Sequence, residues 1–421
     1  MAMRVGFAEA DITPPVGTHK IGWIVDIVSE QVLDPLYARA AVIESGGETI
    51  GFVQLDLLCI LAEDVAEIRR RIAEAFGVGG ERVMVSATHN HAGPAVASLG
   101  DATRDEPYVR ALIDNCVRVF GRAMENLREA RIGFGRCCEF GVSHNRRVIM
   151  RDGTVRTHGS FADPDALCLE GPIDPEVAVT AARDDGGRLL GAIVNFACHP
   201  THHGPGGLLS AGYPGALAGE MKRRGVPVTL FLNGASGNLS TSDPATGGTD
   251  HSMEEVAGIL AEDVGGVLKD MEMRDSVRLG AKSRTLDLPF REATDDQVRG
   301  TARGAQRFVD PASYDRHMPA LLRYIRERGT EPAEVQVLDL AEYAYVAVPA
   351  EYFVQHGLRI KEQAYPRRPL VVSCANGILG YVPHAEAFRR GGYETTFCAW
   401  SKLAPGAGDL LADAAIEMLR A

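Results

Sequence analysis

The sequence predicts an α/β protein with a mixed β-sheet core flanked by helices. Along the whole 421-residue chain, short runs rich in β-branched and apolar residues alternate with longer segments whose apolar residues recur at helical spacing. Some neighbouring strands are joined by tight turns such as Gly46-Gly47, so antiparallel pairs must occur beside parallel ones. With 45% hydrophobic and 24% charged residues, the composition is that of a globular protein with an ample core.

The predicted elements follow one another without tandem repeats or long linkers. Strands are expected where short apolar or alternating runs occur, at residues 4–8, 37–43, 49–57, 82–87, 131–140, 177–182, 189–197, 228–232, 277–288, 334–340, 343–348 and 370–374. Helices are expected where an apolar stripe recurs, at residues 62–76, 108–127, 213–224, 252–271, 321–328 and 408–419, with further helices opening at Thr294 and ending at Gln363.

Two regions depart from this pattern. Residues 141–171 are polar and rich in turns, which predicts an irregular loop of a length that is often functional. Residues 292–332 are richer in charge than their surroundings and are predicted to form a lid or a subdomain. Otherwise we expect residues 1–421 to form a single domain.

The charge balance and the cysteines narrow the partners and the compartment. A net charge of −12 disfavours nucleic acids and anionic membrane surfaces as partners, and no run is long enough for stable membrane insertion. The N-terminus lacks the apolar core of a signal peptide, and the eight cysteines contain no CxxC pair. We therefore expect a cytoplasmic protein with reduced thiols that acts on a small molecule. The oligomeric state stays open.

The stretch Thr88-His89-Asn90-His91-Ala92-Gly93-Pro94 carries the strongest chemical signal. It follows the predicted buried strand 82–87, and residues two apart on a strand point the same way. His89 and His91 are therefore expected to project together from the strand end as half of a metal site. The simpler interpretation is two surface histidines in a polar turn.

Other predicted strands also end in polar residues. His199 precedes Pro200, Glu351 follows Pro349, and Asn376-Gly377 leads to Tyr381. Ligand sites of α/β proteins gather at such strand ends, and two histidines with a carboxylate suffice for a zinc centre with an open position. Each residue also has a structural interpretation. His199 could be hydrogen-bonded to the backbone at the strand end, and Glu351 could be an acidic residue in the first turn of the next helix, where the helix dipole favours it.

These motifs together resemble the N-terminal catalytic domain of the neutral/alkaline non-lysosomal ceramidases. The resemblance runs from Val5-Gly-Phe-Ala-Glu-Ala-Asp-Ile-Thr13 to the end of the chain, in the family order. It passes through Ser86-Ala-Thr-His-Asn-His-Ala-Gly-Pro94, Asn145-Arg146, Gly171-Pro-Ile-Asp-Pro175, His199-Pro-Thr201, Gly237-Asn-Leu-Ser240, Pro349-Ala-Glu351 and Gly380-Tyr-Val382.

The resemblance implies a zinc hydrolase that cleaves an amide bond. In the family's pattern the Zn²⁺ ligands correspond to His89, His199, Glu351 and Tyr381. A simple core tyrosine is an alternative for Tyr381, because phenolate ligation is unusual. The implied mechanism is attack of zinc-bound water on an N-acyl carbonyl.

The resemblance also assigns roles beside the metal. His91 corresponds to a histidine that exchanges a proton, Arg146 to an arginine of the polar loop, Tyr393 to a tyrosine that binds the carbonyl oxyanion, and Ser240 to a serine beside the metal. Ser240 has no visible base next to it, so a cap or turn in the loop is its alternative role.

A Gly-rich turn and one further histidine complete the predicted site. The backbone of the turn 233–238 is suited to cradling an anion, although a tight turn is the default interpretation. The residues expected to bind substrate are Asn233, Gly237, Asn238 and His202.

The chain also departs from the family. It ends where a further C-terminal β-rich domain would begin, so we expect a stand-alone form of the catalytic domain. Residues 292–332 show no apolar lip for docking to lipid, so the substrate need not be ceramide. A zinc hydrolase of an ester, lactone or glycosidic bond is the alternative, and a non-catalytic binding protein on a degenerate hydrolase fold fits less well.

Overall fold

The computed structural model describes residues 2–246 and 251–421 and contains three main sheets. The first sheet is five-stranded and consists, in spatial order, of β7 (Val83–Ala87), β6 (Glu48–Leu55), β5 (Tyr37–Ser45), β1 (Arg4–Asp11) and β9 (Arg128–Glu129). The second is also five-stranded, with β18 (Thr229–Asn233), β16 (Leu189–Phe196), β15 (Glu176–Arg183), β10 (Arg131–Cys138) and β20 (Met273–Arg274). The third is four-stranded, with β21 (Leu279–Pro289), β22 (Thr330–Leu340), β23 (Tyr343–Ala347) and β25 (Arg368–Val372).

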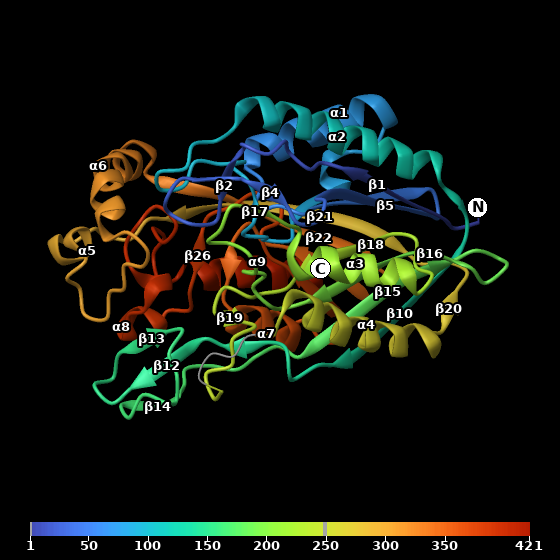
Figure 1. Ribbon diagram of the computed structural model, residues 1–421. Coiled ribbons are helices and arrows are strands. Elements are labelled where there is room, and N and C mark those ends of the chain that lie inside the picture. Colours follow the sequence, from blue (N-terminus) through green and yellow to red (C-terminus); the bar gives the residue numbers. More distant parts are fainter. Residues whose placement is uncertain (1, 247–250) are drawn as a thin grey trace.

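Helices cover the outer faces of these sheets. Their bounds are α1 (Ala62–Phe76), α2 (Glu106–Glu125), α3 (Gly212–Arg223), α4 (Met253–Lys269), α5 (Asp295–Arg299), α6 (Pro311–Arg328), α7 (Val354–Gln363), α8 (Ala387–Arg390) and α9 (Ala407–Arg420). Figure 1 shows α1 and α2 together on one side of β1 and β5, with α4 and α7 on the opposite side of the molecule. The predicted α/β class with mixed sheets flanked by helices is confirmed.

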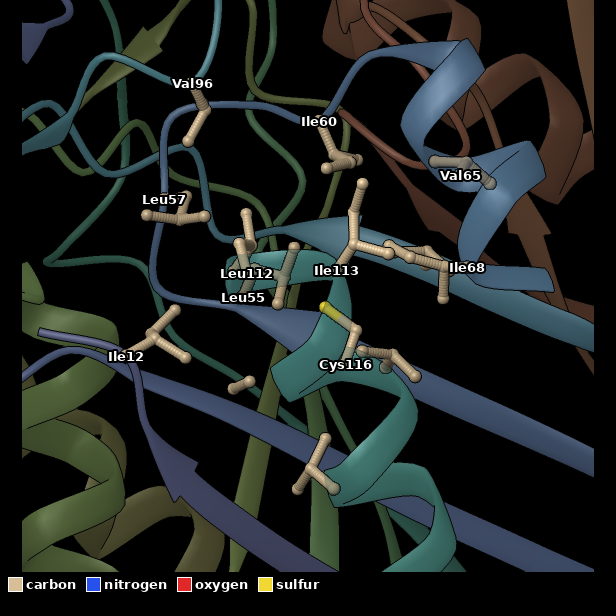
Figure 2. Close-up of a cluster of buried hydrophobic side chains, with 14 of the residues drawn as sticks. Ile12, Leu55, Leu57, Ile60, Val65, Ile68, Val96, Leu112, Ile113 and Cys116 are labelled. Carbon is tan, nitrogen blue, oxygen red and sulfur yellow. The ribbon is translucent and has the colours of Figure 1, made fainter. Parts of the chain in front are cut away.

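The core lies in layers between these elements. The apolar faces of α1 and α2 pack on the first sheet through residues such as Ile68, Leu112 and Leu55, as Figure 2 shows. The other face of that sheet packs against the second and third sheets through Phe52 and Tyr345, whose ring centroids are 5.0 Å apart. Burying such side chains is worth roughly 1.5–3 kcal/mol each, so these layers hold the sheets in place.

Each main sheet contains one parallel pair of strands that is connected through a helix. The pairs are β6 with β7 through α1, β16 with β18 through α3, and β23 with β25 through α7. The carboxyl ends of parallel strands are where α/β proteins place their ligand sites. His89, His199 and Glu351 follow β7, β16 and β23, respectively.

Short strands complete the fold, and some lie where the sequence predicted an irregular loop. Within residues 141–171 the structure forms β11 (His144–Asn145), β12 (Arg147–Met150), β13 (Val155–Thr157) and β14 (Ala166–Leu169). The prediction was wrong here because these strands have only two to four residues each, too few to show a strand pattern in the sequence. They pair only with one another or with β19 (Leu239–Ser240). The other short strands are β2 (His19–Ile21), β3 (Ile27–Val28), β4 (Gln31–Val32), β8 (Gly93–Pro94), β17 (Leu208–Leu209), β24 (Glu351–Tyr352) and β26 (Tyr381–Val382).

The helix predicted at 321–328 begins ten residues earlier, at Pro311 of α6. Asp310 caps it by accepting a hydrogen bond from the Ala312 N–H, and proline is favoured in the first turn. Pro319 lies inside the helix and weakens the helical signal in the sequence.

Candidate metal centre

Three imidazoles converge where the three parallel pairs end. The Nε2 atoms of His89 and His91 each lie 3.1 Å from Nε2 of His199, and 3.4 Å from one another. A carboxylate oxygen of Glu351 lies 3.2 Å from Nε2 of His89 and 3.8 Å from that of His199. The ligand atoms of the three histidines are close enough together to hold one metal ion.

The second nitrogen of each ring is fixed by a backbone carbonyl. Nδ1 of His89 lies 2.9 Å from the Leu58 oxygen, and Nδ1 of His91 lies 3.0 Å from the Gly22 oxygen. Nδ1 of His199 lies 3.3 Å from the Ser236 oxygen. Because a carbonyl only accepts hydrogen bonds, each Nδ1 carries a proton and each Nε2 faces the centre. This is the arrangement by which proteins orient metal-binding histidines.

The electrostatics favour a positive charge at the point where the rings meet. Burial opposes a charge on His89, but Cys374 and Glu351 outweigh it and raise its pKa well above the usual value. Burial, together with the charge at His89, lowers the pKa of His91 and His199 far below the usual value. A single cation is therefore stabilised there, and a divalent metal ion fits in place of the proton on His89.

His89 reaches this position by an unusual backbone conformation. The sequence predicted strand alternation, but β7 ends at Ala87 and His89 adopts a φ of 69°. The loop after β25 holds this turn, because the Ala87 N–H donates to the Cys374 carbonyl at 3.1 Å. Cys374 also places its sulfur 3.4 Å from Nδ1 of His89. The expected convergence of His89 and His91 is present, although the strand geometry expected for it is not.

Glu351 and Tyr381 are brought together by a short parallel ladder. β24 pairs with β26 so that Glu351 lies directly opposite Tyr381. The phenol of Tyr381 hydrogen-bonds to Glu351 and accepts a hydrogen bond from the Arg146 guanidinium at 3.2 Å. Burial and then Glu351 raise the pKa of Tyr381 well above its usual value, so the phenol keeps its proton in the metal-free chain.

Arg146 is held in place by buried partners. Its guanidinium donates to a carboxylate oxygen of Glu394 at 2.9 Å and to the Gly237 carbonyl at 2.7 Å. Arg147 donates to the other oxygen of Glu394 at 2.6 Å, and Thr157 donates to it at 2.7 Å. Sequence reasoning missed Glu394, although its place beside Tyr393 in a charged segment was a usable signal.

A cavity of about 530 Å³ opens in front of these groups. The predicted residues that line it are His89, His91, Arg146, His199, Glu351, Tyr381 and Tyr393. The ring of Tyr393 lies 5.6 Å from that of Tyr381, centroid to centroid. Sequence reasoning missed the aromatic residues of the cavity, which carry no motif: Trp23, Phe308, Tyr314 and Trp400.

The other predicted site residues are absent from the part of the cavity wall that the described residues form. The Ser240 hydroxyl accepts a hydrogen bond from the Ser242 N–H, and the His202 ring contacts the His251 carbonyl. The Asn233 amide donates to the Thr88 carbonyl. The Asn238 amide binds Gln355.

Gly237 has a packing role instead. A Cβ atom there would lie 2.4 Å from the Glu351 carbonyl oxygen, so only glycine fits. The residues of the turn 233–238 thus pack against and hydrogen-bond to the segments that carry the metal centre. The geometry does not support their predicted substrate-binding role.

Comparisons with known proteins agree with this description. The sequence profile of the family described as "Neutral/alkaline non-lysosomal ceramidase, N-terminal" matches residues 3–205. The neutral ceramidase of Pseudomonas aeruginosa is 25% identical over 483 aligned residues, which cover 95% of this chain and 70% of that protein.

Solved structures show the same fold. The crystal structure of neutral ceramidase from Pseudomonas aeruginosa has a TM-score of 0.77 at 22% identity, covering 100% of this chain and 75% of that chain. A ceramidase complexed with C2 gives a TM-score of 0.79 at 22% identity, with the same coverage. The resemblance inferred from the sequence motifs is confirmed.

Proposed function

Starting from this confirmed resemblance to the neutral/alkaline non-lysosomal ceramidases, a hydrolase family, we propose that the chain is a zinc-dependent hydrolase that cleaves an N-acyl bond of a small molecule. The observation that carries the proposal is the convergence of three Nε2 atoms and the Glu351 carboxylate on the wall of one cavity. Imidazole nitrogens with a carboxylate oxygen form the donor set of catalytic zinc sites.

His89, His199, Glu351 and Tyr381 would hold the ion. The two histidines and Glu351 supply the usual ligands, and Tyr381 reaches the group through its pairing with Glu351. A bound zinc ion supplies Lewis acidity, which polarises an acyl carbonyl and lowers the pKa of water toward neutral. His91 lies as close to His199 as His89 does, so its geometry also suits a ligand.

The remaining residues serve the amide itself. Hydrolysis breaks the C–N bond, joins the oxygen of water to the acyl carbon and delivers a proton to the departing amine. Tyr393 would donate a hydrogen bond to the acyl oxygen as negative charge develops there. His91, fixed through its Nδ1 on the Gly22 carbonyl, would carry the proton to the amine.

Ser240 has no part in the proposed chemistry. Its hydroxyl accepts from the Ser242 N–H, and β19 pairs it with His144 of β11 rather than with the centre. The same site groups would also act on an ester. The apolar walls of the cavity favour an acyl compound over a sugar.

Two broader predictions accompany this proposal. Phe308, Val309 and Tyr314 line the cavity, which supports a lid within residues 292–332. The eight cysteines lie in the described part of the chain and form no disulfide bond with one another. The reducing, cytoplasmic setting stays a prediction from the sequence. No helix in the described part of the chain has the length and apolar character needed to cross a membrane.

The test combines metal analysis with product identification. We expect the purified protein to contain about one zinc ion per chain and to release a carboxylic acid and an amine from N-acyl compounds. His89→Ala should lose zinc and lower kcat/KM by roughly 10²–10³-fold or more. That range is the loss typical of removing one oxyanion-hole donor, and removing the metal should cost at least as much. His384→Ala, a change at a histidine outside the cavity wall, is the matched control. A zinc-free active protein, or full activity in His89→Ala, would overturn the proposal.

A further inference from the structure

The cavity has a polar end and an apolar end. Beyond the metal centre its walls are mainly apolar and aromatic, with Trp23, Ile24, Leu99, Phe308, Tyr314 and Trp400 among the lining residues. Such a space binds the apolar part of a ligand while the polar groups at one end orient it. The size and shape of the apolar end therefore decide which substrates reach the centre.

One wall of the apolar end comes from the segment that precedes and opens α6. Two aromatic residues and the valine between them in the chain, Phe308, Val309 and Tyr314, line the cavity here. We call these three residues the aromatic wall. The ring of Phe308 stacks on that of Tyr393, with centroids 5.0 Å apart and planes 19° apart. The wall is thus in direct contact with the tyrosine proposed to bind the acyl oxygen.

The aromatic wall is tied to the opposite side of the cavity. The Ser313 hydroxyl donates to the Ile24 carbonyl at 3.4 Å, and the Arg316 guanidinium donates to the Asp101 carboxylate at 2.6 Å. The Asp101 N–H in turn donates to the same Ile24 carbonyl at 2.9 Å. These contacts hold the wall in place beside the cavity.

Val309 shows that this placement is enforced by the fold. Its φ is 66°, a left-handed conformation that β-branched residues strongly disfavour. The bend lies between Phe308, which packs on Tyr393, and Pro311, where α6 begins. The unfavourable conformation persists because the contacts on both sides determine it.

We infer that the aromatic wall makes this site discriminate between N-acyl compounds by the length of their acyl chain. The inference rests on the proposed hydrolysis of an N-acyl bond and adds the residues that select the substrate. Phe308 and Val309 are the specificity-determining residues, because they lie at the cavity wall next to Tyr393.

The test measures kcat/KM for a series of N-acyl compounds that share one small amine and carry acyl chains of two to sixteen carbons. With the zinc-loaded wild type, we expect kcat/KM to rise about fourfold for each methylene buried against the wall and to level off within the series. Phe308→Ala should move this limit to longer chains by several carbons. Val309→Gly should move it in the same direction, and glycine accepts the left-handed backbone, which guards against loss of folding.

Phe140→Ala is the matched control, because Phe140 is 66% exposed and is not a residue of the cavity wall. It should leave the chain-length profile unchanged. A wild-type profile that climbs steadily to sixteen carbons overturns the inference, as does an unchanged limit in both Phe308→Ala and Val309→Gly. Failure to cleave any member of the series overturns the proposed function itself, and with it this inference.

Discussion

The two ends of the cavity differ in what holds their side chains. At the polar end each imidazole is fixed by a backbone carbonyl, and Arg146 is held by the buried carboxylate of Glu394. At the apolar end Phe308 and Tyr314 are held by ring contacts, and Val309 is 53% exposed. Directional bonds thus define the reacting groups, whereas side-chain shape defines the space for the substrate.

This difference teaches that chemistry and selectivity are separable in this molecule. The polar end is built at the carboxyl ends of parallel strands in the core. The apolar end depends on a segment outside the main sheets, which Figure 1 shows leading into α6 at one end of the molecule. Changes at the polar end should therefore affect kcat, and changes at the apolar end should affect the choice of substrate.

Tyr393→Phe gives the largest expected effect among the following tests. Phenylalanine keeps the ring that stacks on Phe308 and removes only the hydroxyl. We expect kcat to fall by about 10²–10³-fold with little change in KM, because the lost hydrogen bond forms mainly in the transition state. Steady-state kinetics on one N-acyl substrate measure this. A raised KM with unchanged kcat would mean that Tyr393 only binds the substrate, as the apolar residues do. That result would contradict the division between the two ends of the cavity.

Glu394→Gln tests how far the polar end depends on its buried charges. Breaking one partner of a buried ion pair costs about 3–5 kcal/mol, and here two guanidinium groups lose their carboxylate. Urea unfolding should show this loss of stability. Glu386→Gln, at an exposed carboxylate 3.2 Å from Arg389, is the matched control and should cost less than about 1 kcal/mol. Equal effects in the two variants would contradict the prediction.

The same carboxylate predicts a pH dependence of stability. Burial alone would raise the pKa of Glu394, but Arg147 and Arg146 lower it to about 2. Because the folded-state pKa lies below that of an unfolded glutamate, about 4.3, the stabilisation is complete above this value. It is lost as the pH falls from about 4 toward 2. Unfolding free energies of wild type and Glu394→Gln should therefore converge over this range, and a constant difference would contradict the assignment.

Ser240→Ala should have the smallest effect. The Ser242 N–H loses its acceptor, which costs about 1 kcal/mol of stability. We expect kcat/KM to change by no more than about twofold, because the side chain is outside the cavity wall. Loss of a nucleophile would instead lower kcat by several orders of magnitude. A kinetic loss of that size would return Ser240 to the chemistry.

Most of the fold could be predicted because its elements have strong local signals. The apolar stripe of α1 and the capping box that opens α4 at Ser252 are readable within a few residues. The strands β12 to β14 were missed because each is only three or four residues long and they pair with one another. The start of α6 was missed because Asp310-Pro311 reads equally well as a turn.

The candidate site was predictable where a metal-binding or acidic residue directly follows a predicted strand. His89, His199 and Glu351 each follow a strand of a parallel pair, and the predicted convergence of His89 and His91 occurs by a left-handed turn instead of strand alternation. Glu394 was missed because its partner Arg146 lies 248 residues away in the chain. The chemical roles assigned to the predicted site residues stay predictions, which the experiments above test.

The amino-acid sequence alone determined the type of each element and the kinds of polar group that follow the strands, since periodicity and turn residues act over a few positions. Only the tertiary structure decided which carbonyl fixes each imidazole, which carboxylate holds Arg146, and that Phe308 packs against Tyr393. These contacts join distant segments, and their geometry depends on how three sheets and their helices pack. No local pattern in the sequence encodes that packing.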